Sequence, residues 1–538
     1  MTYDYIIVGA GSAGCILASR LTDSGKYSVL LLEAGGTDHA WRFKVPVGYV
    51  FTYYDEKSNW MYYSEAEKEL GGRKMYVPRG KVVGGSGSIN ALIYVRGQPS
   101  DFDDWAAGGN AGWSFEEVLP YFKKIESHPL GDTPYHGSNG PIRITRMKDR
   151  IHPVCTAFLD ACDSLGYARN DDFNGASFEG AGVYDINTRG GLRDASSRAY
   201  LRPALRRPQL RFVPECLVEK ILFEGNRARG VRFRRAGVVQ ECFAAREVIL
   251  SAGAVGTPKL LQLSGVGERE LLKRHGIPVT HHAPAVGQNL QDHLCVSYYY
   301  RANRRTLNDE YGRWLGRIKA GLQFMLLRAG PLSLSVNQAG GFFRSTPGRR
   351  CANLQVYFNP LSYEIPKEKG QMPRPKPYSG FLVAASSCRP SSRGSVEIAS
   401  GRVADPPLIR PNFLTTQHDI DEAIQGSLLI RKLVNAPALA DITVEETDPG
   451  RRVSSEADML QYFRQNSGSI YHLCGSCAMG ASAATSVVSN RLQAHGLDGL
   501  RIADASIFPN VTSGNINAPT MMVAEKAAAM ILADAVGT

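Results

Sequence analysis

The chain lacks any hydrophobic run long enough to cross a membrane. None of its segments approaches the ~18–20 uninterrupted apolar residues that a membrane-spanning helix needs. The first four residues, Met1 to Asp4, lead directly into an apolar segment without the pattern of a cleavable secretion signal. We therefore expect no integral membrane span and a cytoplasmic location.

Cysteine is sparse, with ten residues in a chain of 538. This density is too low for a small secreted scaffold held by disulfides and agrees with a reducing compartment. One CxxC pair is present, Cys474 and Cys477, but there is no second CxxC and no histidine at a matching spacing. A redox or metal pair is one interpretation of this motif. We favour two small buried residues and expect no metal.

Long basic runs are also absent. The net charge is +11, yet the basic residues are scattered and form only short pairs such as Arg206 and Arg207. Nucleic-acid binding requires a concentrated patch, so we expect no nucleic-acid partner; a solvated surface or a mild preference for anionic partners accounts for the charge. Hydrophobic content of 43% is ordinary for a globular protein, and the chain length indicates two or more domains.

What the chain does contain is a nucleotide-binding pattern at its N-terminus. A predicted strand ends at Val8 and is followed by a glycine turn, an amphipathic helix and a second strand. Gly9 permits a tight turn, Gly11 lets backbone N–H groups approach a pyrophosphate, and Gly14 lets the helix pack on the sheet. Glu33 ends the second strand, where a carboxylate can accept both hydroxyls of an unphosphorylated ribose, which disfavours NADP. An ordinary glycine turn is the alternative, but these flanks favour a dinucleotide site.

A second glycine-rich loop covers residues 79–90. Four glycines and two serines within nine residues suit backbone amides that wrap an anion or a flat ring. A flexible linker is the alternative. The apolar residues that flank its central segment 84–88, namely Val82 and Val83 on one side and residues 89–95 on the other, favour an anchored loop.

Later segments return to the nucleotide-binding architecture. Alternating segments between Leu210 and Leu250 predict a β-meander, which leads into a helix from Thr257. The last forty residues predict a strand that ends at Asp504 and a helix that begins at Asn517, with a proline in its first turn. One domain is therefore expected to be assembled from distant pieces of chain.

With these motifs in place, the chain resembles the glucose–methanol–choline (GMC) family of FAD-dependent oxidoreductases over essentially its whole length. Residues 171–175 and 199–203 look most like the bacterial alcohol, choline and sorbose dehydrogenase branch. The motifs that carry the resemblance are Asp4–Gly14, Glu33–Gly35, Gly80–Asn90, Ser251–Pro258, Val286–His293, Tyr471–His472, Met479–Gly480 and Asp504–Lys526.

The resemblance and the order of segments together predict an α/β fold with two domains. A Rossmann-like FAD-binding domain is expected from residues 1–155, 202–300 and 466–538. An α+β substrate-binding domain with an antiparallel sheet is expected from residues 156–201 and 301–465. The second domain has two strand-like segments and one long helical pattern, at Leu354–Phe358, Gly380–Ala385 and Asp419–Leu433.

The resemblance implies FAD rather than NAD, held without a covalent bond. Some relatives attach FAD through a histidine where this chain has Ile89, whose side chain cannot form that bond. The implied cofactor contacts are Gly9, Gly11, Ser12, Ala13 and Gly14 at the pyrophosphate, Glu33 and Ala34 at the adenosine, Val218 at the adenine, Val83, Gly84, Gly85, Asn90 and Ala91 around the flavin, Asp504 and Ala505 at the ribityl and phosphate groups, and also Trp60, Ala252 and Asn517.

The resemblance also implies the catalytic residues. His472 matches the family's base, which takes the hydroxyl proton while a hydride passes to flavin N5, and an unperturbed imidazole pKa of about 6.5 suits that task. Asn517 matches a second polar group that orients the substrate oxygen. A helix N-cap is the alternative for Asn517, whereas substrate contact leaves Asn515 to serve the backbone. We interpret His293 as a structural histidine.

The predicted function is FAD-dependent oxidation of a primary alcohol, polyol or sugar to an aldehyde or ketone, with electrons passed to a quinone or another acceptor. An oxidase that uses O2 and releases hydrogen peroxide is the close alternative, while a non-redox FAD-containing lyase and a non-catalytic flavoprotein are more remote. Choline is doubtful, because residues 335–342 contain no acid. Polar Asn337 and Gln338, with Tyr357 and Phe358 nearby, would suit a neutral alcohol.

Overall fold

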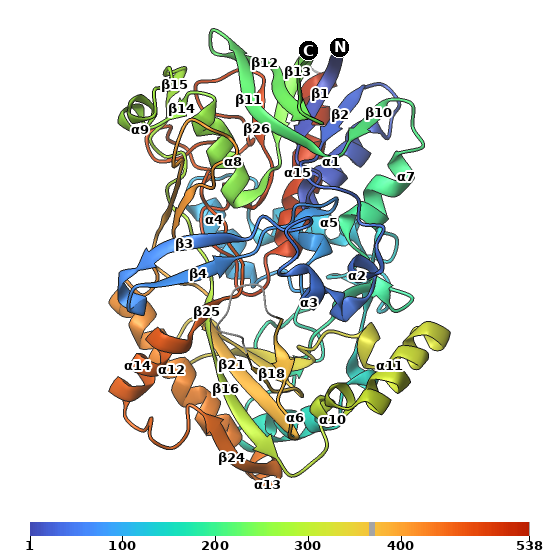
Figure 1. The fold of residues 1–538 in the computed structure, drawn as a ribbon, viewed down its shortest axis with the longest axis vertical. Coiled ribbons are helices and arrows are strands. Elements are labelled where there is room, and N and C mark those ends of the chain that lie inside the picture. Colours follow the sequence, from blue (N-terminus) through green and yellow to red (C-terminus); the bar gives the residue numbers. More distant parts are fainter. Residues whose placement is uncertain (365–371, 537–538) are drawn as a thin grey trace.

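The computed structural model describes residues 1–364 and 372–536, which form two large sheets with helices packed around them (Figure 1). The mostly parallel sheet lies in the upper half of Figure 1 and the antiparallel sheet in the lower half. A hairpin of β3 (Tyr62–Glu67) and β4 (Arg73–Val77) lies between them. The predicted α/β class, with a Rossmann-like part assembled from distant segments, is confirmed.

The parallel strands of the first sheet form the nucleotide-binding architecture. Val8 pairs with Leu32 on one side and with Leu250 on the other, and Leu250 also pairs with Ile502. The carboxyl ends of these strands therefore meet at one edge, which is where open α/β sheets bind their ligands. In spatial order the strands are β10 (Leu210–Val213), β2 (Val29–Leu32), β1 (Thr2–Val8), β13 (Val238–Leu250) with its second partner β26 (Leu500–Ile502), β12 (Arg227–Arg235) and β11 (Cys216–Glu224).

Strand β10 corrects the predicted meander. Residues Leu210–Val213 pair in parallel with β2 at the edge of the sheet, so they are not the first strand of the meander. The antiparallel meander consists of β11, β12 and β13. Alternation of apolar and polar residues reveals a strand but not its partner, which is why the sequence grouped β10 with the wrong neighbours.

Helix α8 (Gly253–Leu263) begins four residues before the predicted start and contains Pro258. A proline inside a helix offers no N–H to the carbonyl four residues earlier. Here that carbonyl, of Ala254, accepts a hydrogen bond of 2.6 Å from the hydroxyl of Ser476. A distant side chain therefore satisfies the group that Pro258 leaves open, and the helix continues.

The second sheet is antiparallel and carries helices on its outer side. It includes both predicted strands, as β18 and β21, while the predicted helix over 419–433 is α12. Strand β16 belongs to this sheet, although its first residue Leu294 falls in a segment expected for the nucleotide domain. In order the strands are β24 (Thr443–Asp448), β16 (Leu294–Ala302) with its further partner β25 (Gly468–Ser469), β21 (Gly380–Ser387), β18 (Leu354–Asn359), β17 (Ala339–Phe343) and β7 (Gly180–Val183).

The helices complete the layers. Helices α12, α6, α13 and α14 pack with the second sheet, whereas α10 and α11 lie at the lower right of Figure 1. Among residues 1–364 and 372–536, no helix combines the length and apolar character needed to cross a bilayer. The bounds are α4 (Pro99–Ala107), α5 (Phe115–Ile125), α6 (Val154–Ser164), α10 (Leu307–Gly312), α11 (Trp314–Leu327), α12 (Gln417–Val434), α13 (Pro437–Ile442) and α14 (Glu456–Asn466).

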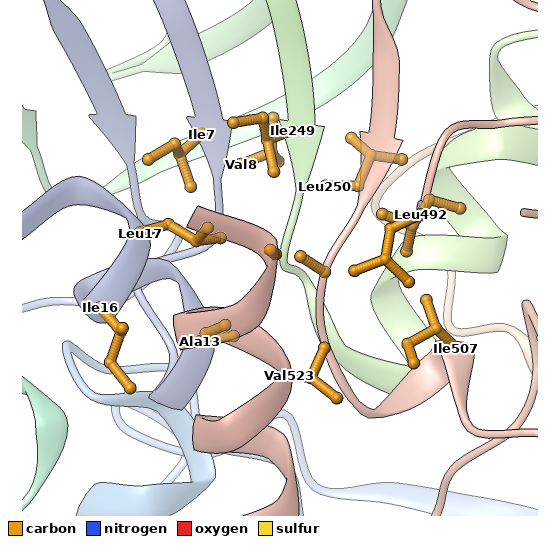
Figure 2. Close-up of a cluster of buried hydrophobic side chains, with 14 of the residues drawn as sticks. Ile7, Val8, Ala13, Ile16, Leu17, Ile249, Leu250, Leu492, Ile507 and Val523 are labelled. Atoms are coloured by element: carbon orange, nitrogen blue, oxygen red, sulfur yellow. The ribbon is translucent and has the colours of Figure 1, made fainter. Parts of the chain in front are cut away.

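The largest core lies beneath the parallel sheet. Helices α1 (Ser12–Thr22) and α15 (Asn517–Val536) pack against each other there, and Figure 2 shows their side chains meeting those of β1 and β13. Ile7, Leu17 and Val523 are completely buried in this core. Cys474 and Cys477 belong to the same core, in line with their interpretation as small buried residues.

We predict that Gly14→Ala destabilises this core by about 1–3 kcal/mol, the usual cost of overpacking. A Cβ atom on Gly14 would lie 1.9 Å from the backbone oxygen of Gly9. The control is Gly321→Ala on α11, where a Cβ meets open space and alanine favours the helix by up to about 1 kcal/mol. Thermal and urea unfolding measure both variants. Equal stability of the two would contradict the proposed close contact.

Candidate active site

A large cavity, of about 1990 Å³, is lined by residues of both sheets. One part of its wall comes from the carboxyl edge of the parallel sheet, with Gly11 and Glu33. Another part comes from the antiparallel sheet, with Tyr299 and Tyr357. His472 lines the cavity between these parts, so a bound group on the nucleotide side and a substrate on the other can meet at this histidine.

The two glycine-rich loops touch each other at the cavity wall. A Cβ atom on Gly85 would lie 2.8 Å from the Cα atom of Gly11, and Gly85 has a positive φ of 55°. A Cβ atom on Gly9, which has φ of 100°, would lie 2.5 Å from the oxygen of Ser251. Only glycine fits these positions, because any side chain would separate the loops.

Helix α1 begins at the contact between these loops. Its N-cap is Gly11, which has no side chain to accept hydrogen bonds from the first amides of the helix. Gly11, Ser12 and Ala13 all line the cavity. Uncapped amides and the positive end of the helix dipole together suit a pyrophosphate.

Glu33 lies at the end of β2 with its carboxylate in the cavity wall. One carboxylate oxygen accepts a hydrogen bond from the amide of Ala10 at 2.9 Å, and the other accepts one from the amide of Gly35 at 2.8 Å. Burial raises the pKa of Glu33 to about 7, against the opposing effect of these amides. Each oxygen keeps a further lone pair, so the carboxylate can also receive two ribose hydroxyls.

Most of the residues predicted to contact the cofactor line this cavity. Three do not, namely Gly14, Val83 and Gly84, which lie behind the wall. Gly14 packs on Gly9, and Gly84 donates its amide to the carbonyl of Ala10 at 2.7 Å. The predicted residues that form the wall are Gly9, Gly11, Ser12, Ala13, Glu33, Ala34, Trp60, Gly85, Asn90, Ala91, Val218, Ala252, Asp504, Ala505 and Asn517.

Asp504 supports the wall from the end of β26. Its carboxylate accepts hydrogen bonds from the amide of Gly253 at 2.9 Å, the hydroxyl of Thr257 at 2.7 Å and the amide of Ser506 at 2.7 Å. Burial raises the pKa of Asp504. Because Gly253 begins α8, the carboxylate also caps that helix and holds it against the nucleotide edge of the sheet.

These walls fit FAD. The cavity combines a ribose-binding carboxylate, an uncapped helix N-terminus and a pair of glycine loops whose backbone is exposed to the ligand. FAD needs these three elements for its adenosine, pyrophosphate and flavin parts. Ile89, at the position where a histidine would attach the flavin covalently, is buried beside Phe43 and Val82 and offers no bonding atom.

His472 is held in the cavity by its own backbone. Tyr471, which precedes it, has a positive φ of 69°, a conformation that is costly for a residue other than glycine. The amide of Tyr471 donates to the hydroxyl of Ser469 at 2.8 Å, the guanidinium of Arg79 donates to the carbonyl of Tyr471, and the amide of His472 donates to Asp292 at 2.7 Å. These bonds fix where the imidazole points.

A second histidine contacts His472 directly. Residues 291 and 474 pair in antiparallel fashion, and the amide of Ile470 donates to the carbonyl of His293 at 3.1 Å. This register brings the Nδ1 atoms of His293 and His472 to 2.9 Å from each other. His293 was interpreted as structural, because no motif in the sequence indicates a contact between residues 179 positions apart.

The direction of the histidine–histidine hydrogen bond follows from its neighbours. The Nε2 atom of His293 lies 2.9 Å from the carbonyl of Cys388, which can only accept, so this nitrogen carries a proton. Burial lowers the pKa of His293 to about 4, so the ring is neutral and its Nδ1 is an acceptor. His472 must therefore donate from Nδ1, which leaves its Nε2 unprotonated.

The unprotonated Nε2 of His472 faces Asn515. The amide nitrogen of Asn515 lies 3.1 Å from this atom and donates to it. Burial lowers the pKa of His472 well below its ordinary value, and the contacts with His293 and Arg79 add to the effect. The imidazole is thus neutral at neutral pH, with a basic nitrogen directed into the site.

The structure brings Asn515, and not Asn517, to the imidazole. The Oδ1 atom of Asn517 accepts a hydrogen bond of 2.8 Å from the hydroxyl of Ser12, which joins the N-termini of α15 and α1. The expectation that Asn515 serves the backbone is therefore wrong for its amide nitrogen. Both residues are polar and lie in one helix-start loop, so their spacing alone could not distinguish them.

Two family models, both described as GMC oxidoreductase, match residues 3–295 and 390–524. The chain is 40% identical over 533 residues to an oxygen-dependent choline dehydrogenase of Vibrio vulnificus, with 98% of this chain and 94% of the relative covered. It is 39% identical over 534 residues to an alcohol dehydrogenase (acceptor) of Pseudomonas putida, with 98% and 96% covered.

Solved structures agree with this relationship. Pyridoxine 4-oxidase from Mesorbium loti superimposes with a TM-score of 0.88 at 29% identity, with 98% of each chain covered. Formate oxidase from Aspergillus oryzae superimposes with a TM-score of 0.91 at 25% identity, covering 99% of this chain and 98% of that one. The site and fold thus define an FAD-dependent oxidoreductase that acts on CH–OH groups. The chain belongs to the GMC oxidoreductase family.

We predict that Glu33→Gln weakens FAD binding by about tenfold to a hundredfold, because the amide removes one charged acceptor and turns N–H groups toward a backbone amide. Flavin titration of the apoprotein measures the dissociation constant. The matched control is Glu224→Gln on β11, whose side chain is 72% exposed. Unchanged affinity in Glu33→Gln would exclude the carboxylate as a cofactor ligand.

Proposed function

We propose that this protein oxidises a neutral alcohol with His472 as the base and passes the electrons to a quinone or another acceptor other than oxygen. The observation that carries the proposal is the pair of contacts that His293 makes with the carbonyl of Cys388 and with Nδ1 of His472, from which we infer an unprotonated Nε2 of His472 in the cavity wall. FAD, when bound, would accept the hydride from the carbon that bears the hydroxyl group. The chain supplies the base, the alignment and the shape of the pocket.

The proton transfer begins from the existing contact between His472 and Asn515. A substrate hydroxyl that enters between them donates its proton to Nε2, while its oxygen accepts from the amide nitrogen of Asn515. The proton on Nδ1 stays with His472 and keeps its bond to His293. His293 therefore acts as a positioning residue, since it sets which nitrogen of His472 is the base.

Asn517 is proposed as a supporting residue. Its bond to Ser12 holds the N-terminus of α15 against that of α1, and both termini line the cavity. The positive end of α15 would favour the negative charge that a bound flavin gains on reduction, whereas the N-terminus of α1 would hold the pyrophosphate. In this arrangement Asn517 orients the wall, and Asn515 touches the substrate.

A neutral substrate suits the substrate side of the cavity. Asn337 and Tyr357 line it as the sequence suggested, whereas Gln338 is buried and accepts a hydrogen bond from the amide of His152 at 2.6 Å. The ammonium of Lys376 lies 4.8 Å from the centre of the Tyr299 ring, inside the same wall. A cation already occupies this aromatic face, which disfavours a quaternary ammonium substrate such as choline.

The second candidate is choline oxidation, because relatives 40% identical to this chain are choline dehydrogenases. A comparison of choline with uncharged primary alcohols, polyols, sugars and aryl alcohols separates the two. Anaerobic bleaching of the bound flavin gives the reduction rate with each compound. The proposal requires at least one uncharged alcohol to react faster than choline, and the reverse order would overturn it.

His472→Gln is expected to lower the rate of flavin reduction by about 10²–10⁴-fold while FAD stays bound, because general-base catalysis contributes on this scale. In the wild-type protein the base must be unprotonated. Since the pKa of His472 lies well below the ordinary value of about 6.5, the rate should be constant above that pH and fall only at lower pH. If the reduction rate still rises between pH 7 and 9, as the deprotonation of one group would produce, this assignment is contradicted.

The acceptor is tested on the reduced protein. Rapid and complete reoxidation by air, at the rate seen with a quinone, would establish the oxidase alternative. Failure of every alcohol to bleach the flavin would instead favour a lyase. Slow reoxidation in air and fast reoxidation by a quinone are the expected results.

His293→Leu is predicted to lower the reduction rate by about tenfold to a hundredfold, because the Nδ1 atom of His472 loses its acceptor and the ring is free to take the wrong tautomer. His293→Asn retains an acceptor near the position of Nδ1 and should recover most of the rate. The pH dependence separates positioning from packing. A purely structural role predicts that both variants lose stability and keep the wild-type pH profile.

A further inference from the structure

Helix α11 (Trp314–Leu327) exposes an unusually apolar surface. Its side chains make little contact with the body of the protein, and only Ala320 and Phe324 are buried. Figure 1 shows α11 at the lower right edge of the molecule. The exposed apolar residues, with their exposed fractions, are Trp314 (69%), Leu315 (63%), Ile318 (49%), Leu322 (52%), Met325 (71%), Leu326 (77%) and Leu327 (71%).

The apolar side chains lie on one face of the helix. At about 100° per residue, all of them except Leu327 fall within an arc of roughly 120°. Ala320 and Phe324 lie on the opposite side, where the helix attaches to the protein. The free face is therefore directed away from the body. In water this arrangement is costly, and such faces mark interaction sites.

The surroundings of this face are strongly basic. Residues 301–328 contain seven basic and two acidic residues, a net charge of +5 out of +11 for the whole chain. All seven basic side chains are exposed, at positions 301, 304, 305, 313, 317, 319 and 328. Two of them are offset by acids outside this segment, because Arg301 and Arg304 each lie 3.7 Å from a carboxylate, that of Glu445 and that of Asp441. The partner that fits an apolar face with a cationic rim is apolar in its interior and anionic at its surface.

We propose that α11 docks this protein onto an anionic lipid bilayer. Its 14 residues are too few to cross the hydrocarbon layer, which needs about 20, so the helix lies in the interface with its apolar face in the lipid. Trp314 suits the level of the headgroups, where tryptophan is favoured, and the basic residues contact the lipid phosphates.

The position of α11 beside the cavity gives this docking a consequence. Tyr311 and Arg317, from α10 and α11, belong to the cavity wall together with Phe51, which is 45% exposed. Phe51 packs edge to face on Trp41 at 5.2 Å, and Trp41 is 58% exposed. The rim of the cavity and the docking face therefore adjoin, so a lipophilic molecule in the bilayer is close to the entrance.

The test is sedimentation of the FAD-loaded protein with vesicles. The protein is expected to bind vesicles of phosphatidylcholine with phosphatidylglycerol, to bind pure phosphatidylcholine vesicles more weakly, and to lose affinity as salt is added. The affinity of the variant Met325→Glu/Leu326→Glu for the anionic vesicles should fall by about tenfold or more. This measurement is independent of the alcohol and of the acceptor, so it stands apart from the proposed function.

The matched control is Val238→Glu/Val239→Glu. These neighbouring residues are 59% and 43% exposed at the start of β13, near the top of Figure 1, and the change adds the same charge far from α11. The control should bind vesicles nearly as well as the wild type. Equal loss in both double variants, or no vesicle binding by the wild type, would overturn the proposal.

A second copy of the chain is the other possible occupant of this face. Light scattering of each variant without lipid reports the mass. A dimer that dissociates in Met325→Glu/Leu326→Glu and does not bind vesicles would replace the proposal with a subunit interface. Unchanged flavin content and circular dichroism in the variants establish that they are folded.

Discussion

The hydrogen bond between the Nδ1 atoms of His293 and His472 determines what the site can do. Two such nitrogens can share only one proton, and the carbonyl of Cys388 decides which ring owns it, because it requires a proton on the far nitrogen of His293. His472 is then left with its lone pair in the cavity. Burial strengthens the arrangement, since it keeps both rings neutral.

The fold produces this contact by pairing distant segments at the junction of the two sheets. β16 and β25 belong to the antiparallel sheet, and the chain that follows β25 carries His472 back towards the parallel sheet. Asp292 contributes twice, because it accepts the amides of His293 and His472 at 2.9 and 2.7 Å. Burial raises the pKa of Asp292 to about 6, and the nearby Arg79 and Ser469 oppose that shift. The His472 ring is thus held by a buried network of hydrogen bonds.

The sequence predicted the parts whose chemistry is local. A glycine turn, a helix start and a carboxylate at a strand end each follow from a few consecutive residues, so the βαβ unit and Glu33 were placed correctly in the fold. The sequence was a weaker guide to features that depend on which strands pair with each other. The strand at Leu210–Val213 was assigned to the wrong neighbours, and β16 joined the other sheet, because alternation does not encode pairing.

The same limit applies to the candidate site. His472 was named from a motif, and its placement in the cavity wall is compatible with that role. Asn515 and His293 were missed as its neighbours, because both contacts depend on the register of segments more than 40 residues away from each other in the chain. A residue's type shows that it can donate or accept; only the tertiary arrangement shows to what.

The most direct test is ¹⁵N NMR of the histidine-labelled protein with FAD bound. The signals that disappear in the variant His472→Gln identify the nitrogens of His472. At neutral pH we expect a protonated Nδ1 and an unprotonated, pyridine-type Nε2 on His472. A proton on Nε2, or a doubly protonated ring, would contradict it, because neither form presents a base to the substrate.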